Sequence, residues 1–111
     1  RALWETHVPI LARGLVLADD WLFAAGPPDV LDETVPGVRI RDAQALQAAA
    51  EQEAALAGQR GGTLLAVSKT EGAVQQRRPL DAPPVFDGLV AAGGRLYVAL
   101  ENGAVECWEA E

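Results

Sequence analysis

The sequence predicts a mainly β fold made of two related antiparallel sheets, because one pattern occurs twice and turn residues separate short apolar runs. Residues 14–25 align without a gap on residues 88–99, and six of the twelve positions are identical. Each copy predicts a strand, a two-residue turn and a second strand. Repetition at a fixed spacing is the signature of a repeat architecture. We therefore expect two equivalent hairpins.

The first repeat predicts four strands, of which the first two form its hairpin. They are expected at about residues 12–18, 21–26, 63–68 and 73–79. Asp19-Asp20 provides the turn of the hairpin. The loop before the last strand ends at Gly72, where a left-handed backbone suits glycine.

The second repeat predicts three strands, at about residues 86–92, 95–101 and 104–109. Gly93-Gly94 suits a two-residue turn with both residues at positive φ, and Asn102-Gly103 between apolar runs is a strong hairpin signal. No fourth strand is predicted for this repeat.

A stretch of different character separates the second and third strands. Gly26-Pro27-Pro28 ends the second strand, because proline cannot donate to a sheet. Asp42 is a suitable N-cap for a helix over about residues 43–57, and Gly58 is a suitable stop signal. We expect the helix to lie outside both sheets. It should pack lightly through a stripe of mostly small residues: Ala43, Leu46, Ala50, Ala54 and Ala57.

The spacing of the two copies predicts the architecture. Treating residues 29–60 as an insertion removes 32 residues from the 74-residue spacing and leaves a repeat of 42 residues. Four-stranded propeller blades repeat every ~40–45 residues. We therefore predict a β-propeller fragment over residues 1–111, with a first blade at about 8–80 and a partial second blade at about 83–111. A β-sandwich would explain the strand count but not the repeat.

Charge and composition argue against several partners. The net charge is −7, whereas binding to nucleic acid needs a basic face. The same charge disfavours an anionic membrane surface, and the longest apolar run is far below the ~20 residues that span a bilayer. We expect neither nucleic-acid binding nor membrane insertion. The chain begins at Arg1 and contains no methionine, from which we expect a fragment.

Few side chains suggest chemistry. His7 is the only histidine, and no serine and acid accompany it, so we expect an ordinary loop or strand-start residue. Cys107, the only cysteine, lies within an expected strand, where we predict a buried small hydrophobe. A zinc site lacks its ligands. We predict no catalytic residue, no cofactor and no metal.

The loop after the second strand carries the candidate interaction site. Asp29, Asp32 and Glu33 cluster there behind Pro27-Pro28. Three carboxylates suit a hard cation such as calcium, but the alternating oxygen donors and central glycine of a calcium loop are missing. We expect a solvated loop edge that is available for interaction, since function tends to reside on loops.

The three tryptophans allow two interpretations. Trp4, Trp21 and Trp108 lie near the ends of expected strands, which favours packing between neighbouring blades. The other interpretation is a carbohydrate-binding β-domain, which would require at least two of them on one exposed face.

Residues 84–99, with the following Asn102–Trp108, resemble the PQQ-like (quinoprotein dehydrogenase-like) propeller repeat. That repeat typically reads proline, a short apolar strand, aspartate-glycine, an "LYV"-type strand and an asparagine- or aspartate-glycine turn. Residues 65–74 resemble its threonine-glycine turn before the outermost strand. Leu3-Trp4-Glu5 is similar to the end of an outer strand from a preceding blade.

The resemblance implies C-terminal blades of a bacterial, extracytoplasmic propeller protein. The tryptophan that follows the threonine-glycine turn in the family is replaced by Gln75-Gln76-Arg77. The adjacent cysteines and calcium ligands of PQQ dehydrogenases have no counterpart, and function resides in the site rather than in the fold. We therefore expect a non-catalytic segment that acts in binding or scaffolding; the alternative is a fragment of a PQQ-dependent quinoprotein oxidoreductase. Expected partners are the rest of the propeller or another copy through open sheet edges, and a protein or polymer ligand.

Overall fold

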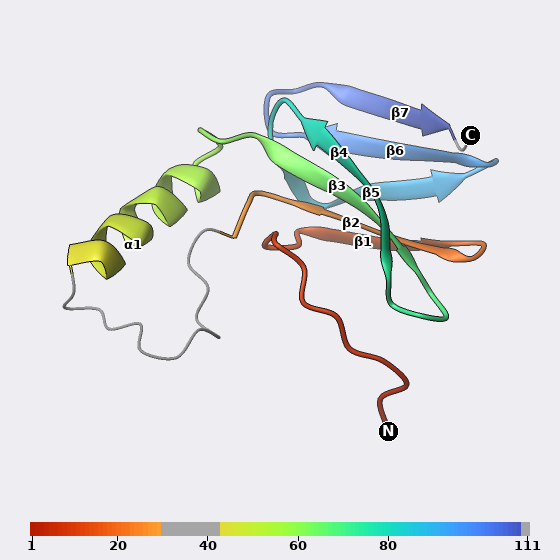
Figure 1. Ribbon diagram of the computed structural model, residues 1–111. Helices are drawn as coiled ribbons and strands as arrows, with labels where there is room; N and C mark the ends of the chain where they lie inside the picture. Colours follow the sequence, from red (N-terminus) through yellow and green to blue (C-terminus); the bar gives the residue numbers. More distant parts are fainter. Residues whose placement is uncertain (30–42, 110–111) are drawn as a thin grey trace.

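The computed structural model describes residues 1–29 and 43–109. Within these ranges the chain is mainly β, with seven strands and one helix (Figure 1). In chain order the elements are β1 (Gly14–Ala18), β2 (Trp21–Gly26), α1 (Ala43–Leu56), β3 (Gly62–Ser68), β4 (Val74–Leu80), β5 (Pro84–Ala92), β6 (Arg95–Leu100) and β7 (Val105–Glu109).

The strands form two antiparallel sheets in which neighbours along the chain are also neighbours in space. The first sheet has the order β1-β2-β3-β4, and the second has the order β5-β6-β7. The mainly β fold with two antiparallel sheets and a helix between β2 and β3 is therefore confirmed, and each strand lies within two residues of its expected bounds. In the described ranges the two sheets do not close into a propeller.

The turns follow the backbone preferences of their residues, with one difference. Gly93-Gly94 has φ values of 59° and 77°, as a two-residue turn of this type requires. Asp19 takes φ 52°, a conformation that aspartate tolerates better than most residues. The hairpin at Asn102-Gly103 has a longer loop than predicted, because residues 101–104 all lie between β6 and β7.

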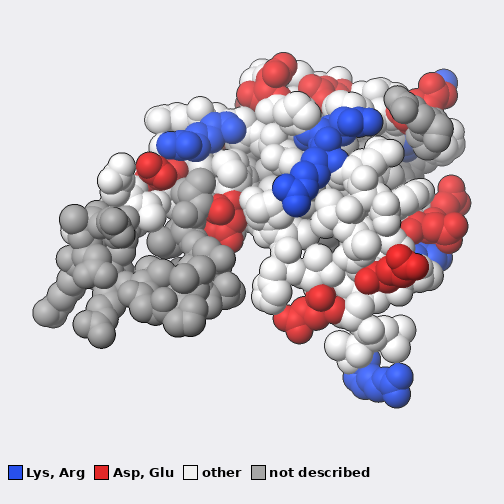
Figure 2. Space-filling model, in the orientation of Figure 1, with Lys and Arg blue, Asp and Glu red and all other residues white. Residues whose placement is uncertain are grey.

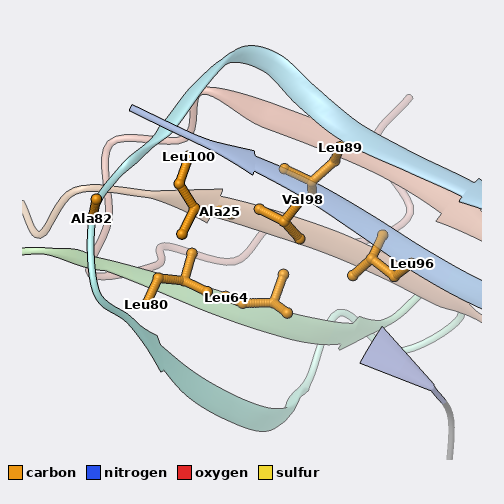
Figure 3. Packing of buried hydrophobic residues seen from close by; sticks show 8 residues of the cluster. All are labelled: Ala25, Leu64, Leu80, Ala82, Leu89, Leu96, Val98 and Leu100. Carbon is orange, nitrogen blue, oxygen red and sulfur yellow. The ribbon is translucent and has the colours of Figure 1, made fainter. Parts of the chain in front are cut away.

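The main hydrophobic core lies between the two sheets (Figure 3). Its buried members are Ala25, Leu64, Leu80, Ala82, Leu89, Leu96, Val98 and Leu100. They come from both sheets and from the segment that links β4 to β5. Strands β1 and β5 lie side by side, and the Asp87 N–H donates to the Arg13 carbonyl at 2.9 Å. The sheets are thus packed face to face, held by buried side chains that each contribute about 1.5–3 kcal/mol.

A second, smaller core covers the opposite face of the first sheet. Its buried members are Ile10, Ala24, Leu65 and Val67. Trp4 and Val8 pack against them from the N-terminal segment, and Trp4 Nε1 donates to the Lys69 carbonyl at 2.7 Å. Residues 1–9 form no strand, so the outer-strand conformation expected for Leu3-Trp4-Glu5 is wrong for this single chain. The segment packs on the face of the first sheet through Trp4 and Val8 instead of pairing along a strand edge.

Helix α1 lies to one side of the sheets, as predicted (Figure 1). Gly58 follows its last turn with φ 91°, and the Gly58 N–H donates to the Ala55 carbonyl at 3.1 Å. The helix thus ends at the expected stop signal. Asp42, the expected N-cap, lies outside the described residues.

The stripe predicted to bury α1 is wrong. Ala55 and Gln52 are buried, whereas Leu46, Ala50 and Ala57 are exposed. A helix made mostly of alanine has no strongly apolar side, so a polar contact helps to set its rotation. Gln52 Nε2 donates to the Pro28 carbonyl at 3.0 Å and draws this side of the helix toward the sheets.

Candidate interaction surface

The repeat gives each residue of the β1–β2 hairpin an equivalent in the β5–β6 hairpin, and strand order makes β7 the equivalent of β3. We call the side of the first sheet that faces the second sheet its forward face. It carries Val16, Phe23, Ala25, Leu64 and Ala66. Phe23 pairs with Ala66 in the first sheet, and its equivalent Tyr97 pairs with Cys107 in the second. Residues that pair directly across two strands lie on the same face, so the forward face of the second sheet is the one that carries Tyr97 and Cys107. That face carries Val90, Tyr97, Ala99, Val105 and Cys107.

The two forward faces differ in what covers them. On the first sheet Ala25 and Leu64 are 0% and 5% exposed beneath the second sheet. On the second sheet Val90 is 57% exposed and Val105 is 69% exposed. The side chains are of the same kind, but no described element covers the second set. The second sheet therefore presents an open apolar face.

Cys107 belongs to this open face, and the prediction that it is buried is wrong. Its thiol is free, and the residue is exposed. The prediction failed because a position in the middle of a strand is not necessarily covered on both faces of the sheet. Cys107 lies directly opposite Tyr97 in the neighbouring strand.

Strand β7 also has an open edge. β6 pairs along one side of it, and no described strand pairs along the other. In the first sheet the equivalent strand, β3, is paired with β2 and with β4. An unpaired edge presents N–H and C=O groups that favour pairing with another chain. The open face and the open edge adjoin, so together they form one continuous surface.

A cleft of about 410 Å³ opens between the sheets at the tips of the two hairpins. Trp21 and Trp108 both contribute to its lining, together with Arg78 and Arg95. Trp108 packs against the main core, and its Nε1 donates to Glu106 at 3.1 Å. Trp4 lies on the other side of the first sheet. Packing therefore accounts for Trp4 and Trp108, whereas Trp21 is more exposed.

The predicted acidic loop is only partly described. Asp29 is half-buried, and its N–H donates to the Pro9 carbonyl at 3.0 Å. Asp32 and Glu33 lie outside the described residues. In the part of the chain that the structure describes, no three His, Cys, Asp or Glu side chains are grouped as metal ligands.

His7 lies on the surface, as expected of an ordinary loop residue. Its Nε2 is 3.2 Å from Glu5 Oε1, and both side chains are more than three-quarters exposed. This arrangement places an acid beside the imidazole, but the described contacts bring no nucleophile to it.

Arg13 is the polar centre of the region where the sheets meet α1. Its guanidinium donates to Glu101 in the β6–β7 loop, and Nη2 donates to the Leu56 carbonyl at the end of α1 at 2.9 Å. The same group lies 5.4 Å from the centre of the Phe86 ring. Its side chain is 9% exposed, so these contacts serve to hold the helix and the second sheet together.

Charged side chains are dispersed over the visible surface in Figure 2, with acidic and basic groups interspersed. No helix in the described ranges is long and apolar enough to cross a membrane. The open apolar face is therefore the most distinctive surface of the described chain.

Sequence reasoning expected open sheet edges available to another copy but did not identify the residues of this face, although a signal was present. In β5 and β6 both alternating sets of residues are apolar: Leu89 and Ala91 on one side, Val90 on the other. A strand that is apolar on both sides indicates burial on both faces. Val90 is nevertheless 57% exposed, so one apolar side of this strand is uncovered in the described chain.

Comparison with known proteins gives no assignment. The chain matches no protein-family model, no curated protein and no solved structure.

Proposed function

We propose that this chain is a non-catalytic segment of a β-propeller-type repeat protein that acts in binding or scaffolding. The observation that carries the proposal is the contrast between the two forward faces. The face of the first sheet is buried by another sheet, and the equivalent face of the second sheet is equally apolar but open. The partner that suits it is therefore another sheet of the same kind.

The stacking of the two sheets supports a repeat that can be extended. Leu22 and its equivalent Leu96 point toward the rear of their sheets, whereas Phe23 and Tyr97 point forward. The forward face of one sheet meets the rear face of the next, so the stacking is head-to-tail. Such an arrangement leaves a free face at each end, and a further sheet can be added by the same contact.

The physical driving force is burial of apolar surface. Each ~100 Å² of apolar surface removed from water contributes roughly 2.5 kcal/mol. In the single chain the side chains of Val90, Tyr97 and Val105 expose apolar surface to water. A partner sheet would remove it from water and would also pair the open edge of β7.

A tandem chain tests the proposed function. Two copies of the full sequence joined by a short Gly-Ser linker should place the second sheet of copy one against the first sheet of copy two. We expect the melting temperature to rise by about 5 °C or more relative to the single chain. Differential scanning calorimetry at a concentration where the tandem chain is monomeric measures it.

The tandem chain contains its own matched control. Tyr97→Asp in copy one places a negative charge at the junction, where the second sheet of copy one meets the first sheet of copy two. The same change in copy two places the charge on the forward face of the last sheet, which no sheet covers. Only the first variant should lose the gain in melting temperature. Equal melting temperatures for both variants and for the single chain would contradict the proposal.

The shared cleft supports a second candidate function, carbohydrate binding. Trp21 and Trp108 line it together, and Gln76 and Arg78 add polar groups that suit hydroxyls. Aromatic rings with a few convergent polar groups are typical of small-ligand sites. Titration with a panel of oligosaccharides should quench tryptophan fluorescence saturably in the wild type but not in Trp21→Ala. Absence of saturable quenching across the panel would remove this candidate.

A further inference from the structure

The offset of the repeat can be continued from the hairpins into the N-terminal segment. The offset that places Gly14 on Gly88 also places Pro9 on Pro83 and Val8 on Ala82. It places residues 1–6 on residues 75–80, which form nearly all of β4. The N-terminal segment is therefore equivalent to the fourth strand of a sheet.

The two equivalent segments pack in the same way. Ala82 is buried in the core against the rear face of the second sheet, with Leu96 and Val98. Val8 packs on the core at the rear face of the first sheet, with Ala24 and Leu65. The N-terminal segment thus already occupies the position of a linking segment between two sheets. No described sheet lies on the other side of it.

Residues 1–6 and β7 correspond to the two strands of one antiparallel pairing. Among the described residues, 1–6 correspond to a fourth strand with no third strand beside it, and β7 is a third strand with no fourth. In Figure 1 the N-terminus lies on the far side of the first sheet from β7, so the two do not meet within the described chain. A second copy of the chain can bring them together.

We propose that residues 1–6 of one copy of this chain form the fourth strand of the second sheet of another copy, by antiparallel pairing with β7. This inference rests on the proposed function and names its partner. The open forward face of the second sheet then covers the rear face of the other copy's first sheet, where Leu15 and Leu17 are exposed. Leu15 is the equivalent of Leu89, which is buried at the contact within the chain.

The register between β3 and β4 predicts the register between β7 and residues 1–6 of the other copy. Ala66 faces Gln76 and Leu64 faces Arg78 across β3 and β4. Cys107 is the equivalent of Ala66, and residue 2 is the equivalent of Gln76. Cys107 should therefore face Ala2 of the other copy. By the same rule Val105 should face Trp4.

Side-chain direction makes this register testable by a disulfide. Directly opposite residues in antiparallel strands have Cα atoms about 4.5–5.5 Å apart, which lies within the range that a disulfide bridges. Residue 3 faces Glu106 and, because successive side chains alternate, points to the other face of the sheet from Cys107. A cysteine at position 2 should react with Cys107, and one at position 3 should not.

The experiment mixes two chains that carry one cysteine each. One is Ala2→Cys combined with Cys107→Ser, and the other is the wild type. After mild oxidation at a range of protein concentrations, non-reducing electrophoresis and peptide mass spectrometry measure the disulfide between position 2 and Cys107. The matched control replaces the first chain by Leu3→Cys combined with Cys107→Ser. Circular dichroism checks that both variants keep the β fold of the wild type.

We expect several times more heterodimer from the position-2 chain than from the position-3 chain, and a yield that falls on dilution. We also expect light scattering to show concentration-dependent association of the wild type. Equal yields from both chains, or a wild type that stays monomeric at high concentration, would overturn strand donation. If the tandem chain nevertheless gains stability at its junction, the proposed function stands and only pairing between free copies is wrong.

Discussion

The two sheets of this chain carry nearly the same apolar pattern but have different surroundings. Phe23 and Tyr97 are equivalent in sequence and register, yet Phe23 packs into the main core and Tyr97 faces outward. The difference does not come from the residues themselves. It comes from the position of each sheet in the stack, because the first sheet has a neighbour on its forward side and the second has none among the described residues. In a repeat protein, burial is thus a property of the neighbour as much as of the sequence.

The largest effect that tests this comparison is a charge placed on either face of the second sheet. Val98 is 0% exposed on the rear face, and Val90 is 57% exposed on the forward face. Val98→Asp should cost more than about 3 kcal/mol of unfolding free energy, because it buries an unpaired carboxylate.

The matched variant is Val90→Asp, which should change the unfolding free energy of the dilute single chain by less than about 0.5 kcal/mol. Urea unfolding of both variants measures the difference. Similar losses in the two variants would mean that the forward face is already covered, and the comparison between the sheets would fail.

Much of the fold was predictable, because its determinants are local. Gly93-Gly94, Gly72 and Gly58 all have positive φ values, and each marks the turn or helix end that its sequence predicted. Short apolar runs bounded by turn residues located the strands. The internal repeat correctly related the two hairpins, since their registers agree.

The candidate surface was less predictable, because exposure depends on contacts that local patterns do not encode. Cys107 has the sequence environment of a buried residue and is exposed only because no described element covers β7. The rotation of α1 was missed because Gln52, a polar residue, faces the sheets through its hydrogen bond to Pro28. The clustering of Asp29, Asp32 and Glu33 stays a prediction, since two of them lie outside the described residues.

Arg13 and its equivalent residue differ in their contacts where the two repeats meet. Its equivalent in the second repeat is Asp87, which is exposed and whose backbone N–H donates to the Arg13 carbonyl. Arg13→Met should lower the unfolding free energy by about 1–3 kcal/mol, because the Leu56 carbonyl and Glu101 lose their donor.

Two control variants distinguish the effect of the planar guanidinium of Arg13, which donates in two directions, from the effect of its positive charge. Arg13→Lys should recover only part of the loss, since an ammonium cannot donate along two directions from one plane. Lys69→Ala removes an exposed cation 3.9 Å from Asp20 and should cost less than about 0.5 kcal/mol. Thermal melts of the three variants rank them, and an Arg13→Met variant as stable as Lys69→Ala would show that the contacts at Arg13 contribute nothing.

The smallest effect compares a covered turn with an open one. Gly72 has φ 74°, and a Cβ there would come within 2.5 Å of the Trp4 ring that packs over it. Gly93 has φ 59° and open space around its own Cβ position. Gly93→Ala should therefore cost only the conformational strain of about 1 kcal/mol, whereas Gly72→Ala adds a clash and must displace Trp4. Displacement is measurable apart from stability, because it should change the tryptophan fluorescence in Gly72→Ala and leave that of Gly93→Ala unchanged. Identical spectra would show that the N-terminal segment does not rest on this turn.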